Sequence, residues 1–200
     1  MHAVLTRTEA LTSHPGLTRP TVPLWQETQH AAATDAAALA PTRSIPLMML
    51  IERARCALGP EHSQRPMQID LHDGSLSMPL ESRPLIHALT RVLHNACRFS
   101  AHTHAVKVRS RMDWADGFDR VVITICDRGV GMTRAHQQHA FEAHWTAATV
   151  AAEPSTGMGL TVARHLVEAQ GGWLELRSAL GIGTEVELWL PAPISVDRPA

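Results

Sequence analysis

The sequence predicts an α+β sandwich, in which helices pack on one face of a single mixed, mostly antiparallel sheet. Three observations predict this class. Four runs of alternating apolar and polar residues, which are typical of half-buried strands, form two pairs that each suit an antiparallel hairpin. Several stretches carry apolar residues at helical spacing along one side, as helices that cover a sheet do. The order of these strands and helices along 200 residues suits one domain with a tail or arm attached.

This domain is predicted over residues 45–192. Residues 1–44 are rich in Ala, Thr and Pro, and only 25–40 offer good helix formers without breakers, so we expect a flexible arm with one short helix. Residues 193–200 are predicted to be a disordered tail.

The first part of the domain is predicted to contain a helix, two strands and a second helix. The first helix covers 46–58 and ends at Gly59-Pro60. Two short alternating strands follow in 67–80, around an Asp73-Gly74 turn. The second helix covers 81–101. Its apolar stripe, like that of the first helix, is expected to face the core; the two stripes are Leu47, Leu50, Ile51, Ala54 and Leu58, and Leu85, Leu89, Val92, Leu93 and Ala96.

The second part of the domain is predicted to hold two hairpins and a third helix. Strands over 104–112 and 120–127 are joined by a polar loop, 113–119. Residues 132–156 have few apolar anchors and are predicted to form a mobile loop. A glycine-rich turn then opens a helix within 156–172, which Gly171-Gly172 closes. Strands over 172–179 and 183–191 form the last hairpin.

Composition excludes several classes of protein. The chain has 18 basic and 19 acidic residues, a net charge of -1, so it lacks the basic footprint of a nucleic-acid-binding protein. Its cysteines, Cys56, Cys97 and Cys126, are odd in number and far apart, which fits a reducing compartment better than a disulfide framework. No apolar run approaches the length of a membrane span, and the start lacks a secretory core. We expect a soluble, cytoplasmic protein.

Three local patterns suggest nucleotide chemistry, although each has an ordinary structural explanation when taken alone. Asp127-x-Gly129-x-Gly131 follows an alternating strand, which is also how a plain strand enters a turn. The segment STGMGL, 155–160, opens a helix, where backbone N–H groups and the helix dipole favour phosphate oxygens. Asn95 continues an apolar helix stripe, so its amide oxygen could reach a Mg²⁺ ion bound to phosphates.

The order of these patterns resembles a known family. RVLHNACRFS, DRGVG, FEAHW, STGMGL and GIGTEVELWLP resemble the N, G1, F and G2 boxes of the catalytic ATP-binding domain of sensor histidine kinases. That family belongs to the wider ATPase group of gyrase, Hsp90 and MutL. The resemblance covers about residues 47–191 and implies the Bergerat-type ATP-binding fold, with ATP and Mg²⁺ as cofactors.

The resemblance also implies roles for individual residues. Asn95 matches the asparagine that chelates Mg²⁺, and Arg98 stands near the phosphates where the family usually has lysine. Asp127 matches the carboxylate that accepts a hydrogen bond from the adenine amino group, and Thr184 is expected to support it. The remaining nucleotide-binding residues implied are the glycines of the two turns, their neighbours and the aromatic box: Gly129, Gly131, Gly157, Met158, Gly159, Leu160, Phe141 and Trp145.

Three positions depart from the family pattern. Arg91 occupies the helix position where gyrase-like ATPases and anti-sigma serine kinases have a glutamate base, and arginine cannot take up a proton at neutral pH. Ser155 replaces the first glycine of the last glycine box and is expected to weaken lid closure or phosphate contact. His14 alone comes near the pattern of a phosphoacceptor histidine, but the prolines around it oppose the two long helices required. We therefore expect His14 to be an ordinary residue of the arm.

The resulting functional prediction is a histidine-kinase catalytic module. It would bind Mg²⁺–ATP and donate the γ-phosphate to a histidine on a separate or missing dimerisation domain; that protein or a response regulator is the expected partner. One alternative is a non-catalytic, pseudokinase-like regulator or phosphotransfer adaptor that acts through protein contacts. An anti-sigma-type serine kinase is disfavoured by Arg91.

Two further groups of residues favour structural explanations. His136, His139 and His144 are better explained as polar residues of a solvated lid than as metal ligands, because no cysteine and only one acidic residue accompany them. Cys97 and Cys126 are expected to be small core residues, with oxidation that blocks nucleotide binding as the alternative.

Overall fold

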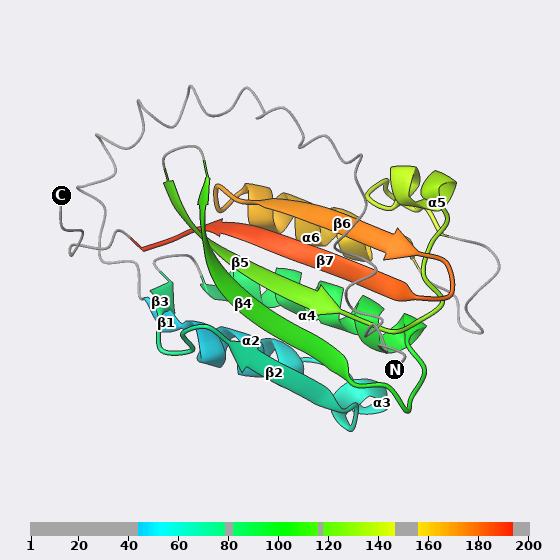
Figure 1. Cartoon of the computed structure of the whole chain (residues 1–200), viewed down its shortest axis with the longest axis horizontal. Helices are drawn as coiled ribbons and strands as arrows, with labels where there is room; N and C mark the ends of the chain where they lie inside the picture. Colours follow the sequence, from blue (N-terminus) through cyan, green and yellow to red (C-terminus); the bar gives the residue numbers. More distant parts are fainter. Residues whose placement is uncertain (1–43, 79–81, 116–117, 147–155, 194–200) are drawn as a thin grey trace, which may run out of the picture. The chain divides into compact units, whose positions relative to one another are not determined.

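The computed structural model describes residues 44–78, 82–115, 118–146 and 156–193 (Figure 1). Their main feature is a five-stranded sheet with the order β2-β4-β5-β7-β6. Only β2 and β4 run parallel among these neighbours, and the other pairs are antiparallel. The strands are β2 (Met67–Leu71), β4 (Val106–Ala115), β5 (Phe118–Cys126), β6 (Trp173–Ala179) and β7 (Gly183–Pro191).

Three helices, α2 (Leu47–Cys56), α4 (Ser82–Phe99) and α6 (Gly159–Glu168), lie on one face of this sheet (Figure 1). The longest of them, α4, packs against both α2 and α6. A two-stranded sheet, β1 (Ile45–Pro46) with β3 (Ser77–Met78), lies beside α2. The predicted α+β sandwich is thus confirmed.

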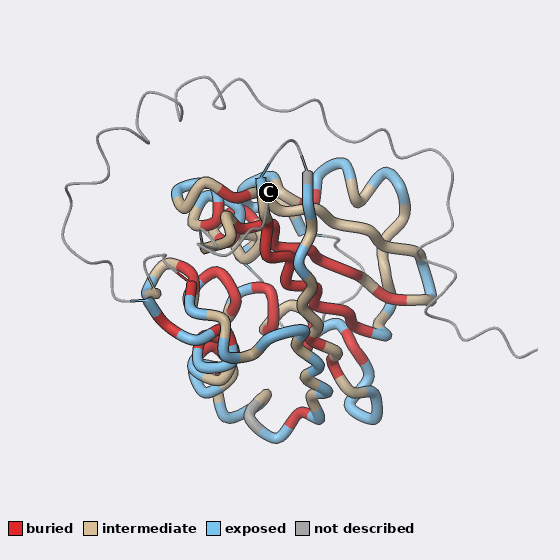
Figure 2. Tube along the Cα trace, turned by 60° about the vertical axis from the view of Figure 1, so that its left-hand side comes forward, coloured by how far each residue is buried: buried red, intermediate tan, exposed pale blue. Residues whose placement is uncertain are grey.

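The core lies between these helices and the inner face of the sheet, where Figure 2 shows the buried segments concentrated. Both predicted helical stripes are confirmed, since every one of their apolar residues is buried. They meet inward-facing strand residues, which alternate along each strand with residues of the outer face. These strand residues are Val106, Val108, Val121, Ile123, Ile125, Val186, Leu188 and Leu190.

The two strands predicted around the Asp73-Gly74 turn exist, but they do not pair with each other. β2 pairs in parallel with β4, whereas β3 pairs with β1 in the smaller sheet. The chain leaves β2, passes through α4 and returns in β4, and such a crossover connects parallel strands. A hairpin interpretation of this segment is therefore wrong.

The first predicted hairpin is longer than expected. Pairing continues through Asp113↔Arg120, Trp114↔Asp119 and Ala115↔Phe118, so the predicted loop over 113–119 belongs mostly to the strands. This pairing leaves only 116–117, Asp-Gly in the sequence, between the two strands, and these two residues lie outside the described ones. The polarity of 113–119 misled the prediction because these strand ends are solvent-facing rather than loop.

The segment after β5 is more ordered than predicted where it is described. A short helix, α5 (Arg134–His139), begins at Thr133, whose Oγ1 accepts a hydrogen bond from the His136 N–H at 3.2 Å. Such a cap satisfies a backbone donor that the first helical turn cannot. The mobility predicted for 132–156 stays a prediction, because 147–155 lie outside the described residues.

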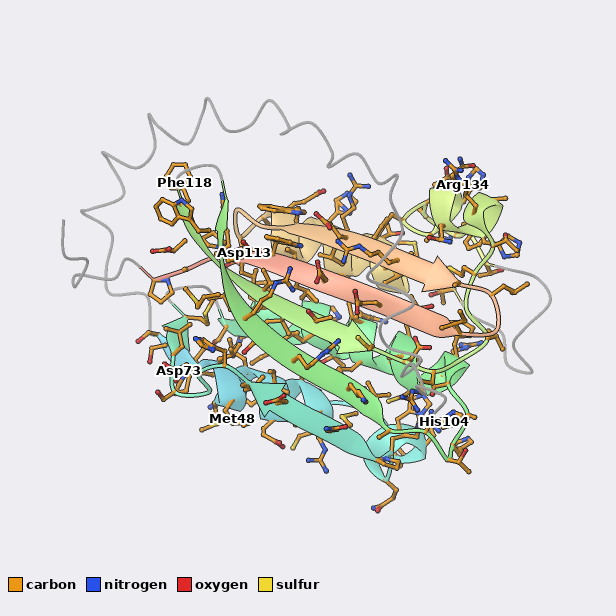
Figure 3. The ribbon with its side chains drawn as sticks, viewed as in Figure 1. Met48, Asp73, His104, Asp113, Phe118 and Arg134 are labelled. Atoms are coloured by element: carbon orange, nitrogen blue, oxygen red, sulfur yellow. The ribbon has the colours of Figure 1, made fainter. Side chains whose placement is uncertain are left out.

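No described helix covers the outer face of the sheet, which instead carries long charged and aromatic side chains (Figure 3). Glu185 and Glu187 are only 5% and 4% exposed there. The Arg111 Nη1 lies 2.7 Å from the Glu187 Oε1, and the indole rings of Trp173 and Trp189 stack with centroids 5.1 Å apart. Glu185 lies near the guanidinium groups of Arg109 and Arg177, and Glu187 also accepts from the Trp189 indole N–H at 3.2 Å. Arginine side chains therefore compensate both buried carboxylates.

Several predictions fall outside the described residues: His14, Ser155, the arm except its last residue and the tail except its first. Within the described ranges, no helix combines the length and hydrophobicity that crossing a bilayer would take.

Candidate functional site

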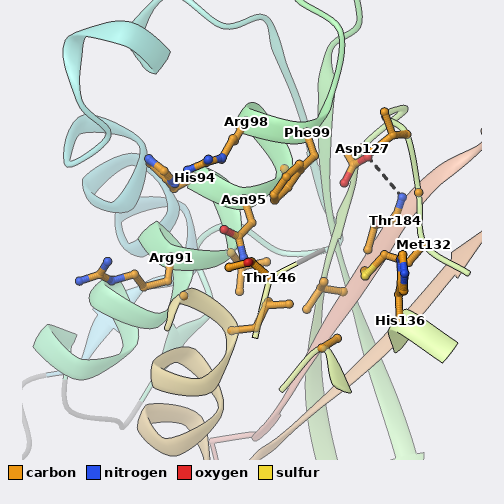
Figure 4. Close-up of a pocket in the computed structure, with 18 of the residues that line it drawn as sticks. Arg91, His94, Asn95, Arg98, Phe99, Asp127, Met132, His136, Thr146 and Thr184 are labelled. Atoms are coloured by element: carbon orange, nitrogen blue, oxygen red, sulfur yellow. Dashed lines mark hydrogen bonds between the residues drawn. The ribbon is translucent and has the colours of Figure 1, made fainter. Parts of the chain in front are cut away.

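A cavity of about 490 Å³ opens between α4, the turn that follows β5 and the start of α6 (Figure 4). This volume lies within the range of small-molecule sites. Most of the predicted nucleotide-binding residues line the cavity, although they come from segments far apart in the sequence. The predicted residues on its wall are Asn95, Arg98, Asp127, Gly131, Trp145, Gly157, Gly159, Leu160 and Thr184.

Helix α4 provides one wall, because the turns of a helix bring residues three and four apart to the same side. Arg91, Asn95 and Arg98 share this side, next to the stripe that enters the core. A Cβ atom on Gly159 would lie 3.2 Å from both the oxygen and the nitrogen of the Asn95 amide. The glycine at the start of α6 therefore provides the space that the Asn95 side chain occupies.

Asp127 provides the opposite wall, at the end of β5. Its Oδ1 accepts hydrogen bonds from the Gly129 N–H at 2.8 Å and from the Thr184 N–H at 3.2 Å, the latter drawn as a dashed line in Figure 4. The Asp127 N–H in turn donates to the Thr184 carbonyl at 2.9 Å. Burial raises the pKa of Asp127 from 3.8 to about 6, and the two backbone donors oppose this effect. The structure thus holds a buried carboxyl at the cavity by its backbone neighbours.

A serine that the sequence analysis missed supports this wall. The Ser178 Oγ accepts from the Met132 N–H at 2.8 Å, donates to the Gly183 carbonyl at 2.9 Å and lies 2.9 Å from the Thr184 Oγ1. It therefore ties the turn after β5 to the hairpin that carries Thr184. The sequence offered one indication of this role: Ser178 lies on the same side of β6 as Leu174 and Leu176, which pack against the core.

The glycines of the first turn have different roles. Gly131 has a φ of 63° and lies so close to the Ala179 carbonyl that a side chain would collide with it. Gly129 is placed against the Phe99 carbonyl at the end of α4 rather than on the cavity wall. Gly129 thus allows the turn to approach α4, and Gly131 allows it to approach the last hairpin.

Arg65 holds the end of α4 and was also missed from the sequence. Its side chain is buried, and its Nη2 donates to the carbonyls of Cys97 and Ser100, each at 2.8 Å. Helix ends leave such carbonyls without helical partners, so this arginine satisfies them. Its positive charge also opposes the rise that burial causes in the pKa of the Asp127 carboxyl. A single arginine on a short connection offers no periodic pattern by which to find it.

The α4 side of the cavity is rich in basic groups. Arg91, His94 and Arg98 all line it. Arg91 is exposed, and its Nε donates to the His87 Nε2 at 3.1 Å. Burial lowers the pKa of His94, and the neighbouring His62 and Arg98 lower it further. The two guanidinium groups give this wall the charge that would suit an anionic ligand.

Of the two aromatic residues predicted for the lid, one lines the cavity and the other does not. Trp145 lines the cavity, and its indole ring lies 5.5 Å from the His136 ring. Phe141 is not brought to the cavity wall; the Arg164 guanidinium lies 5.6 Å from the centroid of its ring. Met158 precedes α6 and also does not line the cavity.

Both cysteines next to the predicted site residues are buried. Burial raises the pKa of the Cys97 thiol. Burial and the adjacent Glu185 raise the pKa of Cys126 to about 12. Because the thiolate is the reactive form, both thiols have the character of inert core residues rather than redox sensors.

A scan against protein-family models matches residues 81–194 to the family described as histidine kinase-, DNA gyrase B-, and HSP90-like ATPase. The sensor histidine kinase AruS of Pseudomonas aeruginosa is 29% identical over 169 residues, which cover 77% of this chain and 16% of AruS. The autoinducer 2 sensor kinase/phosphatase LuxQ of Vibrio cholerae is 31% identical over 113 residues, covering 56% of this chain and 13% of LuxQ. The chain thus spans less than a fifth of the length of these relatives.

Solved structures show the same fold. The mycobacterial sensor histidine kinase MprB aligns with a TM-score of 0.63 and 22% identity, covering 75% of this chain and 98% of that one. Full-length ShkA in complex with AMPPNP aligns with a TM-score of 0.60 and 21% identity, covering 86% of this chain and 36% of that one.

Proposed function

The chain belongs to the family of histidine kinase-, DNA gyrase B- and HSP90-like ATPases, and on this premise we propose that its cavity binds Mg²⁺–ATP. In this proposal the chain is the catalytic module of a cytoplasmic two-component histidine kinase, with residues 45–192 as the nucleotide-binding domain and 1–44 and 193–200 as appendages. One observation carries the proposal: Asn95, Asp127 and Gly159, distant in sequence, line a single cavity. The ShkA structure, which holds AMPPNP, supports a nucleoside triphosphate as the ligand class.

In this proposal, Asp127 and its backbone partners form the end of the cavity that recognises the adenine base. One carboxylate oxygen already accepts two backbone N–H groups, which hold the side chain in place. The second oxygen is then available to accept a hydrogen bond from the amino group of adenine. Guanine carries a carbonyl at that position, so two acceptors would face each other and guanine nucleotides would bind more weakly.

The phosphate end is formed by α4 and the start of α6. Arg98 supplies positive charge, and the first-turn N–H groups of α6 favour phosphate oxygens through the helix dipole. The Asn95 amide oxygen suits Mg²⁺, which binds to few protein oxygens and fills its shell with phosphates and water. This amide lies on the cavity wall beside the start of α6, where its oxygen suits the ion. When bound, Mg²⁺ neutralises charge on the phosphates.

The absence of a carboxylate at Arg91 bears on the reaction. A guanidinium cannot act as general base, so this position offers no activation of a water molecule. Phosphoryl transfer depends mainly on positioning and charge neutralisation, which Asn95 and Arg98 would provide. The proposed acceptor is therefore a histidine brought by a dimerisation domain, with a response regulator as the subsequent partner.

Nucleotide-dependent stabilisation tests the binding step. At a concentration 100 times its dissociation constant, Mg²⁺–ATP should add about 2.7 kcal/mol to the free energy of unfolding. Mg²⁺–GTP is the matched control and should raise the melting temperature much less. If neither ATP nor ADP with Mg²⁺ moves the melting temperature, the ATP proposal fails and the non-catalytic adaptor becomes the better account.

Label transfer tests the catalytic step. The chain is incubated with γ-labelled ATP and with candidate dimerisation domains, each alongside a variant whose phosphoacceptor histidine is replaced. Acid-labile label that appears only on the intact domain supports a histidine kinase module. Binding without transfer to any acceptor would reduce the proposal to a nucleotide-binding regulator.

A further inference from the structure

A second cluster of ligating side chains lies beside the nucleotide cavity, between α3 (Pro60–Ser63) and α4. Glu61 and His62 belong to α3, and His94 belongs to α4. One ligand atom from each of the three residues lies within 4.8 Å of the other two. The two imidazole rings meet edge to face, with centroids 4.8 Å apart. Glu61 and His62 lie outside the motifs that resemble the family, whereas His94 directly precedes Asn95 within one of them.

The state of His62 points to a missing partner. Its Nδ1 is shielded from solvent and has no hydrogen-bond partner among the described residues. A buried nitrogen without a partner is unfavourable, and native structures usually satisfy such groups with protein, water or an ion. The exposed Glu61 carboxylate is the acidic member of the cluster. The His62 ring thus carries a nitrogen without a partner among the described residues and lies beside two possible ligands of a cation, Glu61 and His94.

From this geometry we infer that Glu61, His62 and His94 bind a divalent transition metal ion of the zinc class. Two imidazoles and one carboxylate form a ligand set that Zn²⁺ takes, with a water molecule as the fourth ligand. Mg²⁺ prefers oxygen ligands, so this site differs in chemistry from the one proposed at Asn95.

Small movements of the side chains complete the site. Bonds of about 2.0–2.1 Å in a tetrahedron separate ligand atoms by roughly 3.3 Å, somewhat less than the present 4.8 Å limit. Glu61 is exposed and can rotate toward the two rings without disturbing the core. The ion would join α3, only one turn long, to α4 at the rim of the nucleotide cavity.

Titration of Zn²⁺ into the full chain, free of nucleotide and treated with chelator, tests this site. We expect one tight equivalent whose affinity falls at least about 10-fold in His94→Ala and in His62→Ala, since even indirect support of a metal ligand is worth that much. His139→Ala is the matched control, because His139 also pairs with a nearby glutamate, Glu142, but lies outside the cluster. Its affinity for Zn²⁺ should equal that of the parent chain.

Spectroscopy with Co²⁺ identifies the ligands. A site of two imidazoles and a carboxylate should give visible d–d bands without a thiolate charge-transfer band, and Glu61→Gln should change these bands. This exposed substitution keeps the test decisive if a histidine variant unfolds. The inference is overturned if no equivalent binds, if the histidine and glutamine variants bind like the parent, or if a thiolate band shows ligation by cysteine. Because nucleotide is absent throughout, the result does not depend on the proposed ATP site.

Discussion

Replacement of Asp127 by asparagine should raise the stability of the free chain and weaken its response to nucleotide. The Asp127 side chain is 8% exposed, and burial raises its pKa from 3.8 to about 6. At about 1.4 kcal/mol for each pKa unit, ionisation of this carboxyl in the folded chain costs about 3 kcal/mol above pH 6. Asparagine has the same shape, keeps an oxygen for the N–H groups of Gly129 and Thr184, and carries no charge.

The pH dependence of this effect has a definite sign. Between pH 3.8 and 6 the folded chain holds a proton that the unfolded chain has released, so the parent loses stability as the pH rises through this window. The variant cannot titrate at this position. Urea unfolding of both proteins should therefore give equal stabilities near pH 3.5 and a difference that grows to about 3 kcal/mol in favour of Asp127→Asn at pH 7.

The binding measurement should move in the opposite direction. The amide places an N–H donor where the proposal has the second oxygen accept from adenine. Loss of a hydrogen bond to a charged group costs about 1.5–3 kcal/mol, which corresponds to a rise of roughly 10- to 150-fold in the dissociation constant of Mg²⁺–ATP. Calorimetric titration at pH 7.5 measures this dissociation constant for the parent chain and the variant. Unchanged affinity would refute the assignment of Asp127 as the base reader, and a variant less stable than the parent at pH 7 would refute the burial argument.

Three further predictions concern other parts of the chain. Gly159→Ala places a methyl group 3.2 Å from the Asn95 amide, so it should weaken Mg²⁺–ATP binding by about 1 kcal/mol or more, measured by calorimetry, and leave the melting temperature nearly unchanged. Arg111→Met keeps the apolar stem but removes one charged partner of Glu187, which retains Arg177 and Trp189. Since Arg111 is also 42% exposed, we expect a loss of about 2 kcal/mol in urea unfolding rather than the roughly 3–5 kcal/mol of a fully buried pair. Equal stability would contradict the pairing. Alkylation of the native chain at pH 8 should modify Cys56, the exposed cysteine, much faster than the two buried ones, as mass spectrometry of peptides would show.

The parts of the fold that the sequence predicted are those with local periodicity. The stripes that begin at Leu47 and Leu85 specify which helix face is buried, and alternation with a glycine-containing turn identifies the hairpin of β6 and β7. The parallel pairing of β2 with β4 could not be predicted in this way, because it depends on a crossover through α4 rather than on any pattern within β2. Long-range pairing of this kind has no local signature.

In the candidate site, too, residues within local motifs were predicted and residues that act over long distances in the sequence were not. Asn95, Asp127 and Gly159 stand in ordered motifs, and the structure brings all three to one cavity. Ser178 and Arg65 hold the segments around the site through hydrogen bonds to Met132 and to the end of α4, and residues so distant in sequence leave no local pattern. Phe141 matched the aromatic box of the family, and the structure places it away from the cavity wall.

The outer face of the sheet has a consequence for how the chain tolerates substitution. Surface positions usually accept most replacements. Here, however, the buried negative charges of Glu185 and Glu187 are compensated by arginine side chains on the outer face of the sheet. A saturation library screened for folded protein should therefore show two intolerant layers, the apolar core and this charged outer face. Replacements along Arg111, Arg177 and Trp189 would be depleted in such a library to an extent that their position on the exterior would not suggest.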